Sequence, residues 1–367
     1  MADSDSAQTV LEVEQLKTIF STRDGEVHAV NGVSFTLATG ELLGVVGESG
    51  SGKSVTMMSL LKLLPSPPAE HVSGSIHFEG KDVLSMSDEQ MRELRGGDIG
   101  FIFQDPMTSL NPVFTVGFQL VEVLREHLRF NKKQARARAA ELLDLVGIPT
   151  PEQRLNDYPH QFSGGMRQRV MIAMALACDP KVLIADEPTT ALDVTIQAQI
   201  LELVRKLRRE LGMGIIWITH DLGVVAGIAD RVVVMYGGEI VEHAPVHDLF
   251  ERPAHPYTKA LLATMPSVDG SRSDRLLSIS GQPPNLSKHP ASCSFAPRCE
   301  YAFDRCLQQN PAIKDIGNGH EVACWLVEEP LAADREPSAA DKEPLAGVKA
   351  GDPDLTAKST ANERSSL

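Results

Sequence analysis

Short apolar runs alternate with amphipathic stretches along most of the chain. Continuously apolar segments occur at 42–46, 99–103, 182–186 and 215–219, and each has the length of a strand that is buried on both faces. Helical patterns such as the one at 197–211 lie between them. Strands that alternate with helices favour a mainly parallel sheet covered by helices. The pattern therefore predicts an α/β fold.

Two segments depart from this alternation. Val33, Phe35 and Leu37 alternate with polar residues before a turn at Thr39 and Gly40, which predicts an antiparallel hairpin that leads into the buried strand at 42–46. Strand patterns are missing from 105–159, where one helical face carries Ala135, Ala139, Leu142, Leu143 and Val146. We therefore expect an antiparallel β subdomain and a helical subdomain at about 105–180.

The regular pattern stops near residue 265. Residues 266–328 are rich in Pro, Ser and Cys, whereas 329–367 repeat pieces such as EPLA and contain few large apolar residues. A segment of the second kind cannot bury enough apolar surface to fold. We expect a main domain at 1–265, a small cysteine-rich domain at 266–328 and a disordered tail at 329–367.

Composition and charge narrow the class of protein. The chain has 367 residues, of which 42% are apolar, so it can bury a substantial core. Its net charge of −14 argues against a general polyanion-binding surface and leaves only local basic stretches such as 129–139 as contacts. No apolar run approaches the roughly 18 residues that span a bilayer, and the first ten residues lack a signal-peptide pattern. We expect a cytosolic chain, free or attached to a membrane protein.

A glycine-rich segment, GESGSGKS, follows the first buried strand and precedes an apolar helix. Glycines let successive N–H groups point into one anion-sized nest at the helix N-terminus, where the helix dipole also favours negative charge. In this setting Lys53 can reach the β- and γ-phosphates of a nucleotide, and Ser54 can bind Mg²⁺. The predicted nucleotide-binding residues of this loop are Gly47, Glu48, Ser49, Gly50, Ser51, Gly52, Lys53 and Ser54.

Two further motifs narrow the nucleotide chemistry. The strand VLIAD ends at Asp186, which is placed to hold the magnesium shell, and Glu187 follows, placed to polarise a water that attacks the γ-phosphate. Ser163, Gly164 and Gly165 open an apolar helix and form a second anion-binding helix terminus that lacks a lysine of its own. The chain thus offers two separate half-sites for phosphate.

Six motifs now stand in order: GESGSGKS, FIFQDP, FSGGMRQR, LIADEP, ALD and ITHD. In this order they resemble the ATP-binding subunit of ABC transporters over about residues 10–260. The resemblance implies that Gln104 senses magnesium and the attacking water and relays contact with the membrane partner. It also implies that Asp193 lies at a dimer seam and that His220 contacts the γ-phosphate. Phe20 fits the aromatic that stacks on adenine, although an ordinary strand-end aromatic is the alternative.

The signature motif departs from the family pattern of Leu-Ser-Gly-Gly-Gln. Phe162 and Met166 occupy its first and fifth positions. Ser163 to Gly165 remain, so the anion site is retained and is expected to cover ATP held by a second subunit. The polar contact of the fifth position is lost at Met166.

The C-terminal part decides which ABC subunit this is. HPYTKALLATMPSV, GQPPNL and CSFAPRCEYAFDRC are similar to the C-terminal region of oligopeptide and dipeptide importer ATPases, above all to D-type subunits. The resemblance implies a second, F-type ATPase subunit, two permease subunits, an extracytoplasmic peptide-binding protein, and a place on the cytoplasmic face of the inner membrane. A related nickel importer is the alternative. A soluble ABC switch acting on nucleic acid would need long coiled-coil inserts or a second cassette, and the sequence has neither.

Four cysteines occur within 32 residues, at Cys293, Cys299, Cys306 and Cys324. Cytosolic thiols are kept reduced, so a metal is a better explanation than disulfides. The C-x2-C spacing usual for structural zinc is absent, and four thiolates on irregular loops suit a 4Fe–4S cluster, which the resemblance also implies for some members. Zinc, with His320 or His289 as substitutes, and unliganded thiols are the alternatives. The fifth cysteine, Cys178, is expected in the core.

Overall fold

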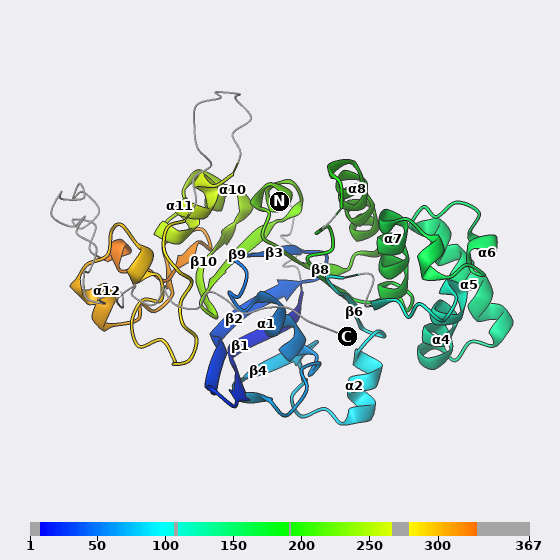
Figure 1. The fold of residues 1–367 in the computed structure, drawn as a ribbon, viewed down its shortest axis with the longest axis horizontal. Coiled ribbons are helices and arrows are strands. Elements are labelled where there is room, and N and C mark those ends of the chain that lie inside the picture. Colours follow the sequence, from blue (N-terminus) through cyan, green and yellow to red (C-terminus); the bar gives the residue numbers. More distant parts are fainter. Residues whose placement is uncertain (1–7, 106–108, 191, 266–278, 329–367) are drawn as a thin grey trace, which may run out of the picture.

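The structure, a computed structural model, describes residues 8–105, 109–190, 192–265 and 279–328. Figure 1 shows two β-sheets at the centre, the helices α4 to α6 at one end of the long axis, and α12 at the opposite end. The expected disordered tail at 329–367 and the start of the expected cysteine-rich domain, 266–278, lie outside the described residues.

The larger sheet has eight strands in the order β11-β12-β10-β9-β3-β8-β7-β6. Its parallel strands are β3 (Leu42–Val46), β6 (Ile99–Ile102), β7 (Val182–Asp186), β8 (Gly214–Thr219) and β9 (Arg231–Tyr236). Its antiparallel strands are β10 (Glu239–Pro245), β11 (Lys314–Asp315) and β12 (Glu321–Val322). Every residue of β3, β7 and β8 is buried, which explains their continuously apolar sequences and confirms the predicted parallel sheet.

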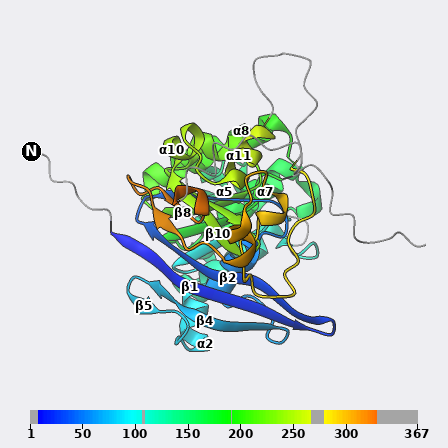
Figure 2. The same ribbon diagram turned by 90° about the vertical axis from the view of Figure 1, so that its left-hand side faces the viewer.

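A second sheet of four antiparallel strands lies beside the first. It consists of β1 (Thr9–Thr22), β2 (Gly25–Ala38), β4 (Ala69–Phe78) and β5 (Lys81–Asp82) in the order β2-β1-β4-β5. Figure 2 shows β1 and β2 running alongside each other over most of their length. The predicted hairpin between 33–37 and 42–46 is wrong, because β2 pairs with β1. Both edges of β3 are occupied by β8 and β9, so β2 has no edge of β3 to join.

Helices cover the larger sheet and extend from it. Those of the main body are α1 (Lys53–Leu60), α2 (Asp88–Leu94), α7 (Gly164–Ala175), α8 (Val194–Leu211), α9 (Leu222–Ile228), α10 (Val246–Glu251) and α11 (Pro256–Ala263). The helices of the insert are α4 (Val116–Leu128), α5 (Lys132–Leu145) and α6 (Pro151–Arg154), followed by the 3₁₀ turn Pro159–Gln161. The predicted apolar face from Ala135 to Val146 is completely buried, which confirms the helical segment.

The core has two parts, one on each face of the larger sheet. Leu42 and Val46 of β3 belong to the cluster that contains the helices, whereas Leu43 and Val45 belong to the cluster against the antiparallel sheet. Successive side chains of a strand point to opposite faces, so β3 contributes to both. Packing on both faces of the sheet therefore holds β3, and with it the start of the loop that follows.

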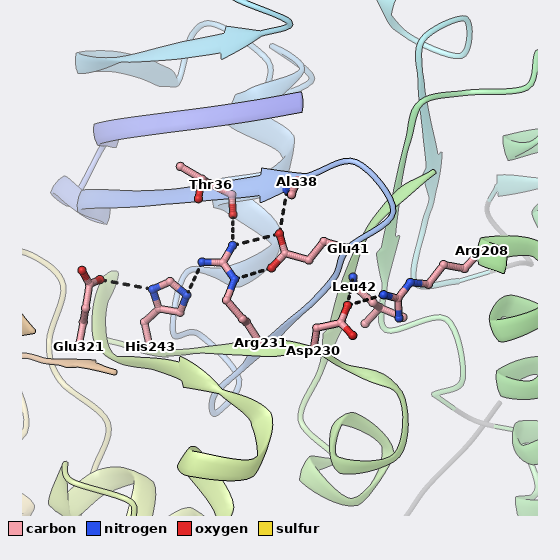
Figure 3. Close-up of polar contacts among 9 residues, drawn as sticks. All are labelled: Thr36, Ala38, Glu41, Leu42, Arg208, Asp230, Arg231, His243 and Glu321. Carbon is pink, nitrogen blue, oxygen red and sulfur yellow. Dashed lines mark hydrogen bonds and ion pairs between the residues drawn. The ribbon is translucent and has the colours of Figure 1, made fainter. Parts of the chain in front are cut away.

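A polar network joins the two sheets to the C-terminal segment (Figure 3). Arg231 of β9 forms an ion pair with Glu41 and donates to the carbonyl oxygen of Thr36 in β2 at 2.8 Å. It also donates to Nε2 of His243 at 3.1 Å, and Nδ1 of His243 lies 3.4 Å from Glu321. Burial among these groups, reinforced by the Arg231 charge, lowers the pKa of His243.

The described C-terminal residues continue the larger sheet at its edge. β12 pairs with β10, and the backbone N–H of Ala323 donates to the carbonyl of Val241 at 2.9 Å. Phe295 belongs to the main core. The remaining elements are the 3₁₀ turns Ala296–Arg298 and Trp325–Val327 and the helix α12 (Asp304–Gln308). This segment is thus attached to the main body by backbone pairing and by a buried aromatic side chain.

Candidate ATP-binding and hydrolysis site

The predicted phosphate loop connects the end of β3 to the start of α1. A side chain at Gly47 would place its Cβ 2.2 Å from the carbonyl oxygen of Met235. At Gly52, where φ is +98°, a Cβ would lie 2.5 Å from the carbonyl oxygen of Ala29. Both positions therefore require glycine, because the loop backbone runs directly against β9 and β2.

Lys53 is buried in the first turn of α1 and turns back over the loop. Its ammonium group donates to the carbonyl oxygens of Gly47 at 2.8 Å and of Glu48 at 3.0 Å. Burial lowers the pKa of Lys53, and the nearby carboxylates of Glu187 and Asp186 oppose that shift. The structure thus places the Lys53 ammonium at the loop, close to the carboxylates at the end of β7.

Asp186 and Ser54 meet across the site. The hydroxyl of Ser54 donates to Oδ1 of Asp186 at 2.9 Å. Burial raises the pKa of Asp186, while the hydrogen bond from Ser54 opposes the rise. The hydroxyl oxygen of Ser54 comes from α1 and the carboxylate oxygen of Asp186 from β7, and oxygen atoms of both kinds are suitable ligands for Mg²⁺. The residue types and their proximity therefore fit the predicted magnesium shell.

Glu187 is the centre of a second group of polar side chains. Its Oε2 accepts hydrogen bonds from Nε2 of Gln104 at 3.2 Å and from the Thr190 hydroxyl at 3.0 Å, and it lies 3.3 Å from Nδ1 of His220. Glu187 has a φ of +46°, and its backbone N–H donates to Ile218 of β8. Gln104 and His220, which are far from Glu187 in the sequence, thus lie at the same carboxylate. Their predicted roles toward ATP stay predictions.

The signature motif lies on a different element. Ser163 caps α7, and its hydroxyl accepts from the backbone N–H of Met166 at 3.3 Å. Ser163 and Gly164 are exposed, whereas Gly165 is buried against Ile196 of α8. In Figure 1, α7 lies well apart from α1, so a single chain does not bring the signature to its own phosphate loop.

The other predicted site residues take the following places. Asp193 is exposed and caps α8 by accepting from the N–H of Ile196 at 3.0 Å. Val194 beside it is 82% exposed. Phe20 is half-buried near the end of β1, opposite Val27 of β2. Met166 is half-buried against the main core. Their roles toward ATP stay predictions.

Comparison with known proteins places the chain in a family. Residues 30–190 match the family described as ABC transporter, and residues 241–306 match the C-terminal region of oligopeptide/dipeptide transporters. The oligopeptide transport ATP-binding protein OppD of Bacillus subtilis is 55% identical over 87% of this chain and 89% of that protein. The dipeptide transport ATP-binding protein DppD of the same organism is 52% identical over 88% of this chain and 96% of that protein. The chain belongs to the ATP-binding subunits of peptide ABC transporters.

Solved structures agree with this fold. The dimeric structure of a bacterial ABC transporter cassette has a TM-score of 0.58 and 28% identity, and it aligns over 64% of this chain and 98% of its own. CbiO1 of Clostridium perfringens, part of an ABC transporter complex, has a TM-score of 0.57 and 31% identity. It aligns over 67% of this chain and 92% of its own. This peptide-transporter subunit therefore has the ABC ATPase cassette fold and is an ATPase that energises peptide transport.

The four clustered cysteines of this ABC ATPase converge on one small cavity. All four line it together with Phe295 and Trp325. Burial raises the pKa of the Cys299 thiol to about 12 and that of Cys324 to about 11, and the neighbouring thiols add to both shifts. Within residues 8–105, 109–190, 192–265 and 279–328, no three His, Cys, Asp or Glu side chains are arranged so as to hold a metal ion.

The remaining candidates for metal binding lie elsewhere. Nε2 of His320 lies 2.7 Å from Glu242, and Nδ1 of His289 donates to the carbonyl of Pro290 at 3.1 Å. Neither histidine lines the cysteine cavity. Cys178 is half-buried against the main core, and burial raises its pKa to about 11.

Sequence reasoning missed two residues of the site. Thr190 holds Glu187 through its hydroxyl, and the hydroxyl of Tyr257 accepts from the backbone N–H of Glu48 at 2.8 Å. Thr190 could have been found from its spacing, three residues after the glutamate at the start of a turn. Tyr257 could not, because 209 residues separate it from Glu48.

Over the part of the chain that the structure describes, no helix is both long enough and apolar enough to cross a membrane.

Proposed function

We propose that this subunit hydrolyses ATP to drive peptide import through a membrane complex, in which it pairs with a second, F-type ATPase subunit on two permease subunits. The observation that carries the proposal is the gathering of Gln104, Glu187 and His220 beside the contact between Ser54 and Asp186. The names of the relatives support peptides as cargo. An extracytoplasmic peptide-binding protein would deliver the peptide to the permeases.

The phosphate loop and its lysine bind the nucleotide in this proposal. The N–H groups at the start of α1 and the ammonium of Lys53 face the β- and γ-phosphates, Ser49 to Ser51 form the turn of the nest, and the ring of Phe20 stacks on adenine. Ser54, Asp186 and Gln104 supply oxygen ligands for Mg²⁺, which when bound neutralises phosphate charge. Ser54 and Asp186 already lie at hydrogen-bond distance, which supports this ligand set.

Glu187 acts as the base of hydrolysis. Its side chain is 14% exposed, and Gln104 and Thr190 hold one of its oxygens by hydrogen bonds. A carboxylate that is fixed in this way can accept a proton from a water directed at the γ-phosphate. His220 lies 3.3 Å from the same oxygen and would contact the γ-phosphate.

Each ATP site would be completed by a second subunit. Ser163 and Gly164 are exposed at the N-terminus of α7, and Asp193 is exposed at the N-terminus of α8. A helix N-terminus that faces solvent can bind the phosphates of a nucleotide held by another subunit. The structure of the similar bacterial cassette is described as dimeric, which supports pairing of two cassettes.

The permeases would bind beside Gln104 on the helical insert, at the cytoplasmic face of the membrane. Apolar side chains are exposed there: Phe103 is 42%, Val113 70%, Phe114 42% and Phe118 47% exposed. The rings of Phe114 and Phe118 stack with centroids 4.6 Å apart. An exposed apolar patch of this kind is typical of a protein contact. No specific observation favours nickel as cargo or nucleic acid as partner.

The proposed division of the chain keeps the boundaries expected from the sequence: an ABC domain at 1–265 with a helical subdomain at about 105–180, a cysteine-rich domain at 266–328 and a tail at 329–367. In the second part we propose that Cys293, Cys299, Cys306 and Cys324 bind a 4Fe–4S cluster. All four thiols line one cavity and soft thiolates favour iron–sulfur or zinc, which supports this, although in the part of the chain that the structure describes the thiols are not arranged so as to hold a metal ion as they stand. Zinc is the alternative cofactor.

Purification of the tagged chain from membranes tests the proposal. The complex should contain two permease proteins and a second ATPase, and its ATP turnover should rise with peptide-loaded binding protein. Isolation of the chain with nucleic acid and without any permease would overturn it. Anaerobic iron and sulfide analysis of the same complex should give about four of each per cluster, whereas stoichiometric zinc would replace the cluster assignment and leave the transport function standing.

A further inference from the structure

The C-terminal segment reaches the phosphate loop through one arginine. Arg298 is the last residue of the 3₁₀ turn Ala296–Arg298, which lies between Cys293 and Cys299, and only 3% of its side chain is exposed. Its two terminal nitrogens donate to both carboxylate oxygens of Glu48, at 2.6 and 2.9 Å. This is a bidentate ion pair between residues separated by 250 positions in the sequence.

All five N–H groups of Arg298 have acceptors. Besides the two bonds to Glu48, the guanidinium donates to the Tyr236 hydroxyl at 3.3 Å and to the carbonyl oxygens of Ile279 at 3.1 Å and Ser280 at 2.9 Å. A guanidinium has five N–H donors in a fixed planar arrangement. Because every donor is used, Arg298 has one orientation, and that orientation also fixes the carboxylate of Glu48.

Glu48 is in turn held on three sides. Arg298 binds its carboxylate, the Tyr257 hydroxyl accepts from its N–H at 2.8 Å, and Lys53 donates to its carbonyl at 3.0 Å. Glu48 is the second residue of the phosphate loop. Its negative charge lies beside a site for a polyanion, so a free carboxylate there would repel the phosphates and compete for Lys53.

We propose that Arg298 is a positioning residue for ATP: by neutralising Glu48 and fixing its carboxylate, it keeps the phosphate loop open to the nucleotide's phosphates and couples the cysteine-rich segment to ATP binding. Arg298 touches no substrate and acts through Glu48. Displacement of the 3₁₀ turn that carries Arg298 would release Glu48 and weaken ATP binding. The inference rests on the proposed ATP-driven transport.

The test compares variants of the complete transporter complex. Arg298→Gln removes the charge and should raise the Kd for ATP about tenfold, while the Kd for adenosine stays unchanged because adenosine has no phosphates. Arg298→Lys keeps the charge without the bidentate geometry and should give a smaller rise. Arg298→Gln combined with Glu48→Gln should restore most of the ATP affinity, because the unpaired carboxylate is then removed. Each Kd comes from competition with trinitrophenyl-ATP.

Arg305→Gln is the matched control from the same segment. Arg305 lies 3.5 Å over the ring of Trp325 and pairs with Glu328, so its loss disturbs the segment without touching Glu48. Its ATP affinity should stay within about twofold of wild type. Wild-type ATP affinity in Arg298→Gln would overturn the inference, as would a double variant no better than Arg298→Gln. Failure of the wild-type complex to bind ATP would instead refute the proposed function.

Discussion

Replacing Glu187 by glutamine tests the centre of the hydrolysis site. Glutamine keeps the shape of the side chain and one acceptor oxygen for Gln104 and Thr190, but it cannot accept a proton from water. A positioned general base contributes about 10²- to 10⁴-fold. At about 1.36 kcal/mol per tenfold this equals about 2.7 to 5.4 kcal/mol of the activation barrier. Glu187→Gln should therefore lower ATP turnover at least about 100-fold.

ATP binding should survive the same change, because the phosphate loop and Lys53 keep all their hydrogen bonds. The assay measures phosphate release and ATP affinity of the whole transporter in lipid, side by side for Glu187→Gln and Lys53→Ala. The lysine variant should lose ATP affinity itself, whereas the glutamine variant should accumulate an ATP-bound closed dimer.

Thr190→Val is the matched control for orientation. It removes one of the hydrogen bonds to the Glu187 carboxylate, worth about 1.5 to 3 kcal/mol for a charged acceptor. Because Gln104 still holds the same oxygen, Thr190→Val should lower turnover by no more than about 10- to 100-fold. Wild-type turnover in Glu187→Gln would refute the base assignment. Equal losses of ATP turnover in Thr190→Val and Glu187→Gln would show that the placement of the Glu187 side chain, and not proton transfer to it, sets the rate.

Three further changes test other parts of the molecule. Ser163→Tyr should block hydrolysis at the partner subunit's loop while this chain still binds ATP, because Ser163 is exposed at the N-terminus of α7, which lies apart from α1 (Figure 1). Phe118→Asp should release the chain from the permeases during purification, since it places a charge in the exposed apolar patch. Burial lowers the pKa of His243 below 6.5, so the unfolded chain binds more protons as the pH falls through 6.5. Stability should therefore decrease below that pH, and His243→Gln should flatten the decrease.

Each of these three predictions has a decisive measurement. A mixed dimer with one Ser163→Tyr subunit reports on the trans effect, and loss of ATP binding in the altered chain itself would contradict it. Pull-down of the permeases by Phe118→Asp at wild-type yield would exclude the patch as their binding surface. Urea unfolding at pH 7.5 and pH 5 gives the stability change, and equal acid sensitivity of wild type and His243→Gln would show that other groups cause it.

The sequence by itself predicted the parallel strands of the larger sheet and the buried helical face of the insert, and it proposed the residues of an ATP site. Continuously apolar runs such as 182–186 specify buried parallel strands, and the helical spacing of Ala135, Ala139 and Leu142 specifies a buried face, because both patterns are local. The motif residues Gln104, Glu187 and His220 each follow a parallel strand, β6, β7 or β8, which places them at the same edge of the sheet.

Only the tertiary structure decided which separate elements meet. The partner of β2 could not be inferred from its own alternation, because that choice depends on β8 and β9 having occupied both edges of β3. The ion pair of Arg298 with Glu48 joins residues 250 positions apart, and no local pattern encodes it. Local propensity decides which helices and strands a chain forms. Which strand edges pair and which buried charges meet depends on all of these elements at once, because they compete for the same partners.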